Sequence, residues 1–246
     1  MPQAEGAGVA LHYAERGAGP AVLMVHGMGG DAIAWEQALD ALAGAGARAI
    51  AYDRRGYGAS GAPQPYSATT VQEQSEDAAA LLAALGAAPA MLVGEGFGAL
   101  VALELLVRRP ELATAAVLAD PPLFAFVPAA TQALADERTQ LEQALRDGGP
   151  AAAIAAWHGA GTDAGRLARA RESPLGFFAD YAGQSSWSPA RRELRAIAVP
   201  VAVVTSPGAP AHVVAAADTA AALLPHARRR ADGDVVAVAA GLLDLS

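Results

Sequence analysis

The sequence predicts an α/β fold in which a mainly parallel sheet is covered by helices on both faces. Short apolar runs alternate along the chain with segments of helical periodicity, which is typical of βαβ units. The runs are apolar throughout, as expected of strands that are buried on both faces. With 246 residues, of which 53% are hydrophobic, the chain is long enough to bury one large core.

The strand pattern begins at residues 9–15, where apolar and polar residues alternate as in an antiparallel edge strand. The continuous apolar runs then predict buried central strands over residues 21–25, 47–52, 90–93, 114–118 and 201–204. Helical apolar spacing predicts helices over residues 69–85, 97–108, 215–224 and 235–245.

The strand pattern stops between residues 121 and 197, which predicts a helical lid inserted after the sixth strand of the sheet. The core is then formed by residues 1–120 and 198–246, and the lid by residues 121–197. Seven of the 13 aromatic residues fall in this lid, among them Trp157, Phe177, Phe178, Tyr181 and Trp187. An aromatic lid over strand ends suits an apolar small molecule as substrate or ligand, although each ring could equally pack lid helices together.

Composition excludes several classes of site and partner. The chain has no cysteine, so it has neither disulfides nor thiolate metal sites, and its five histidines show no paired ligand spacing. We therefore expect no metal and no cofactor. The net charge of −8 argues against a nucleic-acid partner, and the basic triplet Arg228–Arg230 is expected on a solvated strand edge. Residues 1–6 do not resemble a signal peptide, and no apolar stretch reaches membrane-spanning length, so we expect a soluble cytoplasmic protein without a membrane partner.

One short motif carries most of the functional information. Residues 90–100 predict a strand, a tight turn and the start of a helix, in the frame of the G-x-S-x-G nucleophile elbow. Gly96 occupies the position of the nucleophile. Glycine tolerates the strained backbone of such a turn, so the elbow is kept while the attacking hydroxyl is absent.

Four motifs in order resemble those of the alpha/beta-hydrolase superfamily. They are Leu11-His12-Tyr13 with Arg16–Pro20, Val25–Gly30, Tyr52–Ser60 and Gly94–Gly98. The resemblance implies a triad in the chain order nucleophile, acid, histidine. The position that corresponds to the acid is Ala209, so the acid is absent. The position of the histidine falls in a loop before the last helix, and here that loop is shortened to Asp232-Gly233-Asp234 and contains no histidine. The sequence is therefore identified as a member of the superfamily that lacks the triad.

The polar groups that remain define the candidate site. The resemblance implies an oxyanion hole formed by the backbone N–H groups of Met28 and Phe97. Glu95 is the first candidate for a general acid or base, because it adjoins the vacant position. The alternative, which the resemblance implies, is that Glu95 supports the lid or forms an ion pair. Asp120, at the end of the sixth strand, is the second catalytic candidate and could equally cap a turn before the prolines that follow.

The binding site is expected to combine the elbow with the lid. The candidates are Gly96, Met28, Phe97, Trp35, Trp157, His158, Phe177 and Tyr181. The remaining histidines, His12, His212 and His226, are expected to be structural or to face solvent.

Structural roles are expected for several polar residues near the first strands. Asp31 is expected to cap a helix that begins near Ala32. The resemblance implies a structural role for His26, which bonds the backbone around the elbow. Asp53 and Arg54 are expected to brace the loop after the fourth strand through hydrogen bonds and an ion pair.

Three functions remain open from the sequence. The first is a non-hydrolytic enzyme of the cyclase, isomerase or lyase type, acting on an apolar small molecule in bacterial natural-product biosynthesis, since the superfamily includes such enzymes. The second is a small-molecule-binding pseudoenzyme or receptor. The third is an esterase-like hydrolase whose nucleophile, such as Ser60 or Ser206, acts from outside the elbow.

Overall fold

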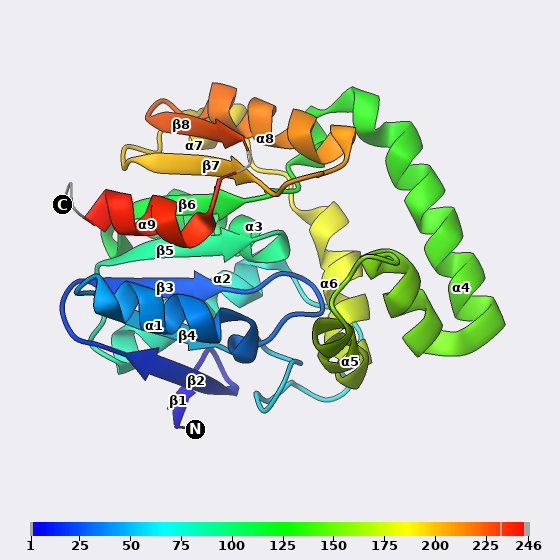
Figure 1. The fold of residues 1–246 in the computed structure, drawn as a ribbon, viewed down its shortest axis with the longest axis horizontal. Coiled ribbons are helices and arrows are strands. Elements are labelled where there is room, and N and C mark those ends of the chain that lie inside the picture. The colour runs from blue at the N-terminus through cyan, green and yellow to red at the C-terminus, as the bar shows by residue number, and fades with distance from the viewer. Residues whose placement is uncertain (1, 232, 244–246) are drawn as a thin grey trace.

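A computed structural model describes residues 2–231 and 233–243, and in them the strands form one mixed sheet (Figure 1). The strand order is β1-β2-β4-β3-β5-β6-β7-β8. Strand β2 runs antiparallel to β1 and β4, and the remaining neighbours are parallel. The strands are β1 (Gln3–Glu5), β2 (Ala10–Arg16), β3 (Ala21–Val25), β4 (Arg48–Tyr52), β5 (Ala90–Glu95), β6 (Ala113–Ala119), β7 (Val201–Thr205) and β8 (Ala227–Ala231).

The predicted α/β class and the five buried central strands are confirmed, with boundaries that differ by at most two residues. The prediction for residues 9–15 is wrong in one respect. Strand β2 is antiparallel, but it is not the edge strand, because β1 pairs outside it with Ala4 opposite Leu11. Strand β1 could not be predicted, because three residues are too few to show a periodicity.

Helices cover both faces of the sheet and complete a three-layer arrangement. Helices α1 (Glu36–Gly44) and α9 (Val235–Leu243) pack on one face, in front of the sheet in Figure 1, and α2 (Val71–Ala84), α3 (Phe97–Arg108) and α8 (Ala211–Leu223) pack on the other. The four predicted helices are confirmed within a few residues at each end. Residues 244–246, at the end of the last predicted helix, lie outside the described part of the chain.

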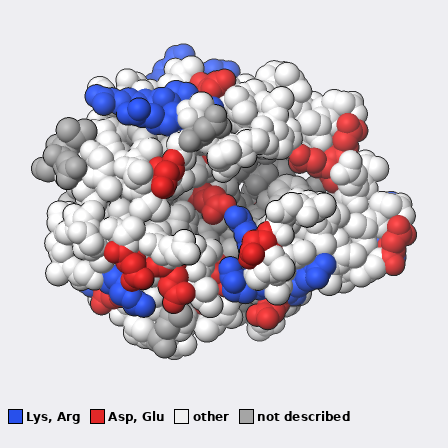
Figure 2. Space-filling view, viewed as in Figure 1, with Lys and Arg blue, Asp and Glu red and all other residues white. Residues whose placement is uncertain are grey.

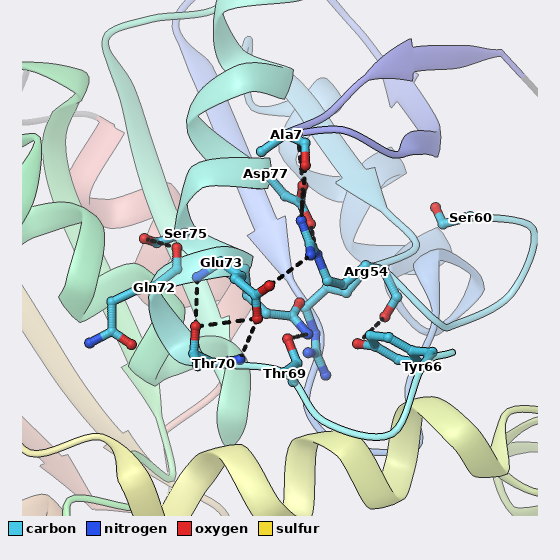
Figure 3. A network of polar contacts seen from close by, with 12 residues as sticks. Ala7, Arg54, Ser60, Tyr66, Thr69, Thr70, Gln72, Glu73, Ser75 and Asp77 are labelled. Atoms are coloured by element: carbon cyan, nitrogen blue, oxygen red, sulfur yellow. Dashed lines mark hydrogen bonds and ion pairs between the residues drawn. The ribbon is translucent and has the colours of Figure 1, made fainter. Parts of the chain in front are cut away.

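Local signals explain two of these helix ends. Helix α2 begins at Val71 because Thr70 and Glu73 exchange hydrogen bonds in a capping box (Figure 3). Asp31 caps the short helix η1 (Ala32–Trp35), accepting a hydrogen bond from the N–H of Ala34 at 3.0 Å, which confirms the predicted cap.

Between β6 and β7 every residue is described, and this segment contains helices and no strand. The longest helix, α4, bends at Gly149, which has φ 70° and ψ −168° and precedes Pro150. The helices of this segment are η3 (Phe124–Phe126), η4 (Pro128–Ala130), α4 (Thr131–His158), α5 (Ala164–Glu172), α6 (Pro174–Ser186) and α7 (Arg191–Arg195); η2 (Pro110–Leu112) precedes β6. Helices α4, α5 and α6 lie beyond the carboxyl ends of the parallel strands, at the right of Figure 1, whereas α7 contacts α3 and α8.

A fully buried ion pair joins this helical segment to the sheet. Arg54, just after β4, donates to the carboxylate of Asp180 on α6 at 3.1 and 2.5 Å, and both side chains are 0% exposed. Tyr57 and Gln74 donate to the same carboxylate at 2.7 and 3.1 Å. Burial is the largest single influence on the pKa of Arg54 and lowers it, but the charge and hydrogen bonds of Asp180, together with Tyr57 and Tyr52, outweigh burial and raise the pKa above its ordinary value.

The loop after the fourth strand is held by hydrogen bonds of Asp53, as predicted. Arg54 also forms an ion pair, but its partner lies outside this loop. Asp53 accepts hydrogen bonds from the N–H groups of Ala32 and Ala59 at 2.8 and 2.9 Å. The acidic partner of Arg54 is Asp180, which comes from the lid segment and not from the loop itself. Sequence spacing could not show this contact, because the two residues lie far apart in the chain.

His26 has the structural role expected of it. Its Nε2 accepts a hydrogen bond from the N–H of Arg54 at 3.0 Å, and its Nδ1 lies 2.8 Å from the carbonyl oxygen of Gly27. Burial, followed by the charge of Arg54, holds the pKa of His26 well below its ordinary value of 6.5.

A basic patch lies at one edge of the sheet. Basic side chains gather over β8, the edge strand that carries Arg228–Arg230, as predicted for this triplet (Figure 2). No helix in the described ranges combines the length and apolarity that a membrane crossing requires.

We expect Asp180→Ala to lower the free energy of unfolding by about 3–5 kcal/mol, because it leaves the Arg54 guanidinium buried without its counter-charge. Chemical denaturation measures the change. Glu111→Ala, which breaks the exposed pair between Glu111 and Arg109, is the matched control and should leave the midpoint unchanged. Equal midpoints for Asp180→Ala and the parent would contradict a stabilising role for the buried pair.

We also expect the protein to lose stability as the pH falls below about 6.5. The pKa of His26 is lowered in the folded state, so below its ordinary value the unfolded chain binds more protons than the native one, and acid favours unfolding. Denaturation midpoints between pH 7.5 and pH 5 measure this slope. His26→Asn should flatten the slope whatever its effect on absolute stability, and an unchanged slope would argue against a neutral buried imidazole.

Candidate functional site

The turn between β5 and α3 has the geometry of an elbow without a side chain at its tip. Gly96 has φ 55° and ψ −119°, and its N–H donates to the carbonyl oxygen of Ala119 on β6 at 2.9 Å. A side chain on Gly98 would collide with the carbonyl oxygen of Val25, so the close approach of α3 to β3 requires glycine there. A Cβ atom on Gly96 would meet only the Cα of Gly27, at 3.8 Å. The space for a nucleophilic side chain is therefore present and empty.

A cavity of about 200 Å³ opens above Gly96, between the carboxyl ends of the strands and the lid helices. Figure 2 shows this face hollowed, with acidic and basic side chains meeting at the rim. Five predicted binding residues line the cavity: Met28, Gly96, Phe97, Trp157 and His158. Both catalytic candidates, Glu95 and Asp120, line it too.

Two backbone donors at this cavity are available to a ligand. Phe97 is the first residue of α3, so its N–H has no acceptor within the helix. The N–H of Met28 donates to no acceptor among the described residues. The amino end of α3 adds a partial positive charge at the same place, which favours an anionic oxygen.

A second cavity of about 360 Å³ lies beside the first, and four of its twelve lining residues are aromatic. Phe124, Glu137 and Trp157 line both cavities and mark the boundary between them. Tyr181 and Trp187 line only the second cavity. The predicted ligand contact of Tyr181 therefore falls in this aromatic compartment.

Two predicted binding residues lie elsewhere. Trp35 is 7% exposed and packs on the opposite face of the sheet, among residues of α1 and β3, so it lines neither cavity. Phe177 is 0% exposed and packs edge-on against Trp157 at a centroid distance of 6.0 Å. It supports the cavity wall from behind, which is the packing role that the sequence left open for lid aromatics.

Glu95 forms an ion pair with the lid. Its Oε1 accepts a hydrogen bond from Arg166 of α5 at 2.8 Å, and the carboxylate is 32% exposed. Arg169, one turn further on, pairs with Asp31 at 3.1 Å. The ion pairs of these two arginines hold α5 over the cavity. The geometry therefore favours support of the lid by Glu95 over a catalytic role.

Asp120 fixes the turn that follows β7. One carboxylate oxygen accepts from the N–H of Ser206 at 3.0 Å and the other from the Ser206 hydroxyl. Asp120 has φ 46°, a left-handed conformation that aspartate tolerates better than most residues. Because both oxygens are engaged, the geometry favours a structural role for Asp120, but at the turn after β7 and not at the turn before the prolines, where the sequence predicts a cap.

Neither serine proposed as a displaced nucleophile faces the site. The hydroxyl of Ser60 donates to the carbonyl oxygen of Asp53 at 2.5 Å and accepts from the N–H of His12 at 2.8 Å. Ser206 is exposed and lines neither cavity. The Ser60 hydroxyl therefore binds the backbone around it, and the Ser206 hydroxyl binds the carboxylate of Asp120.

His158 is a neutral group in the cavity wall. Burial and the nearby charge of Arg166 lower its pKa to about 4. Its Nε2 is buried and has no hydrogen-bond partner in the described part of the chain. The ring lies against Gly29, where the close approach leaves no room for a side chain.

An acid–histidine pair that sequence reasoning missed also lines the cavity. His212 of α8 lies 3.0 Å from Glu137 of α4, measured from Nε2 to Oε1. The sequence places His212 among structural or solvent-facing histidines and gives Glu137 no role. No spacing signal joins a lid helix to α8, so only the three-dimensional packing could bring the two together.

Comparison with known proteins gives the wider context. Residues 20–158, more than half of the chain, match the alpha/beta hydrolase fold family. An epoxide hydrolase of Caballeronia sordidicola is 44% identical over 104 residues, which cover 42% of this chain and 32% of that protein. An uncharacterized hydrolase of Bacillus subtilis is 38% identical over 104 residues, covering 42% of this chain and 38% of that protein. The matches therefore span well under half of these relatives.

Solved structures share the complete fold. The enol-lactonase of Burkholderia xenovorans superposes with a TM-score of 0.78 over 99% of this chain and 98% of that one, at 21% identity. The relatives carry the names of hydrolytic enzymes. The expectation of a non-hydrolytic cyclase, isomerase or lyase in natural-product biosynthesis is therefore wrong, and the third reading, an esterase-like hydrolase, is favoured.

The elbow, the lid over the strand ends and the match over residues 20–158 lead to one conclusion about ancestry. This chain belongs to the alpha/beta hydrolase fold family.

Proposed function

We propose that the chain hydrolyses a small ester or lactone by direct attack of water, without a covalent intermediate. The observation that carries the proposal is the empty space at Gly96 beside two available backbone donors. A carbonyl oxygen bound by the N–H groups of Met28 and Phe97 would be stabilised as it becomes an oxyanion. The gap left by the missing side chain would accommodate the attacking water.

The cavity volumes support a small acyl substrate. The compartment above Gly96, about 200 Å³, has room for roughly seven water molecules at about 30 Å³ each, enough for an ester group and one water. The adjoining aromatic compartment of about 360 Å³ suits an apolar acyl or alcohol portion. The hydrolytic names of the relatives support the same class of reaction.

A second candidate function is binding without turnover. Gly96 favours it, because every covalent route through the elbow needs a side chain there. The same donors and the same aromatic compartment would then hold an acyl compound as a ligand.

We expect p-nitrophenyl esters of short acids to be hydrolysed above the buffer rate, with linear product release from the first turnover. A one-step reaction accumulates no acyl-enzyme, so intact-mass spectrometry should find no adduct during turnover. A burst or an acyl adduct would contradict direct attack by water. Saturable binding of the ester without turnover would support the second candidate instead.

We expect Gly96→Ala to lower kcat/KM at least about tenfold, which corresponds to about 1.4 kcal/mol, because the methyl group occupies the space assigned to water. Gly86→Ala is the matched control: Gly86 has φ 57° and an added Cβ there meets no atom within 4 Å, but it lies far from the cavity in sequence and does not line it. Both variants should lose about 1 kcal/mol or more of stability through the positive φ. Equal activity of Gly96→Ala and Gly86→Ala would remove the gap from the mechanism.

A further inference from the structure

Glu137 and His212 meet where the lid contacts the core, and both side chains line the cavity above Gly96. The imidazole is 12% exposed and the carboxylate 34% exposed. The ring of Phe124 packs against the imidazole at a centroid distance of 5.5 Å. The pair is thus held at the wall of the proposed reaction chamber.

Apolar packing fixes the two helices that carry this pair. Val127, Ala130 and Leu134 pack against Ala215 and Ala216 of α8 in a separate cluster. Glu137 lies one turn after Leu134, and His212 lies one turn before Ala215 and Ala216, so each projects from the face that makes this contact. The geometry of the pair therefore follows from core packing and not from a mobile surface contact.

The contact with Glu137 indicates which ring nitrogen is free. Nε2 of His212 lies 3.0 Å from Oε1 of Glu137, and because a carboxylate only accepts, the ring nitrogen that faces it is the one that carries a proton. Nδ1 then has the lone pair. It has no hydrogen-bond partner among the described residues, and it is not among the side-chain atoms sealed from solvent. An imidazole that faces a carboxylate with one nitrogen and is open at the other has the arrangement of a general base.

The other polar groups of the cavity are less suited to accept a proton. Nε2 of His158 is sealed against Gly29. Glu95 is paired with Arg166, and both oxygens of Asp120 are engaged by Ser206. Among the described titratable groups that line the cavity, His212 is the one that is oriented by a partner and still has an open nitrogen.

We propose that His212 is the general base of the hydrolysis and that Glu137 is its positioning residue; this inference rests on the proposed function. Nδ1 takes a proton from the water in the gap at Gly96. The water oxygen bonds to the carbonyl carbon, and the carbonyl oxygen becomes an oxyanion at the N–H groups of Met28 and Phe97. When the bond to the leaving alkoxide breaks, the alkoxide takes the proton from Nδ1, which yields an acid and an alcohol.

The first experiment compares His212→Ala and Glu137→Gln with the parent, using the complete chain and p-nitrophenyl acetate. We expect His212→Ala to lower kcat about 10²–10⁴-fold with KM changed by only a few fold, and added imidazole to restore part of the rate. Glu137→Gln should lower kcat by less and leave KM near that of the parent. His226→Ala and Glu142→Gln, on the surface of the core and of α4, are the matched controls and should keep the parental kcat.

A purely structural tether between α4 and α8 would give a different pattern. Loss of a tether would change KM and lower the denaturation midpoint, and imidazole would restore nothing. That pattern, or full activity of His212→Ala in a parent that hydrolyses the ester, would overturn the role of His212 while leaving the proposed function intact.

A second measurement tests the inference even where the parent hydrolyses no ester. Phenylboronic acid takes up hydroxide to form a tetrahedral anion that resembles the intermediate of ester hydrolysis. We expect its addition to ¹⁵N-histidine-labelled protein to shift the Nδ1 resonance of His212, assigned by its loss in His212→Ala, and to leave His226 unchanged. An unshifted His212 resonance at saturating boronate would overturn the inference.

Discussion

The buried contact between Arg54 and Asp180 is the constraint on which the site depends. The same guanidinium donates to the carbonyl oxygens of His26 and Gly27 at 2.9 and 3.1 Å and lies 4.9 Å from the centre of the Phe97 ring. It therefore contacts both segments that supply the oxyanion donors, and through Asp180 it fixes the lid helix α6 to them. A charged pair with no exposure is unfavourable unless every polar atom is satisfied, and Tyr57 and Gln74 complete that set.

This arrangement explains how an elbow can persist without its nucleophile. The turn is defined by backbone contacts: the Gly96 N–H bonds to β6, and the absence of a side chain at Gly98 lets α3 approach β3. None of these contacts involves a side chain at position 96. The donors of Met28 and Phe97 are backbone groups as well, so their position is fixed by the fold and survives the loss of the hydroxyl. Serine at this position would have to adopt the φ of 55° that glycine adopts without strain.

The limits of sequence reasoning follow from the same physics. The central strands and α3 could be predicted because burial on both sheet faces and helical periodicity leave regular patterns in the sequence. The elbow followed from motif spacing, and the structural role of His26 followed from the resemblance to the superfamily. Contacts between the lid and the core could not be predicted, because pairs such as Arg54 with Asp180 and Glu137 with His212 depend on how helices of unknown direction pack. The placement of Trp35 was missed for a related reason: its helix packs on the sheet face opposite α3, away from the cavity.

The loss of the nucleophile also changes what the fold requires of a base. A serine hydroxyl has one position, so a base must lie within hydrogen-bond distance of that atom, and only a particular loop can supply it. Water in the gap at Gly96 can occupy several positions within the cavity, so a base can approach it from another wall. Helix α8 and the lid helix α4 form such a wall, and core packing orients Glu137 and His212 there. Although this chain has no histidine after β8, the imidazole of His212 lines the cavity above Gly96, and Glu137 of the lid is its acidic partner.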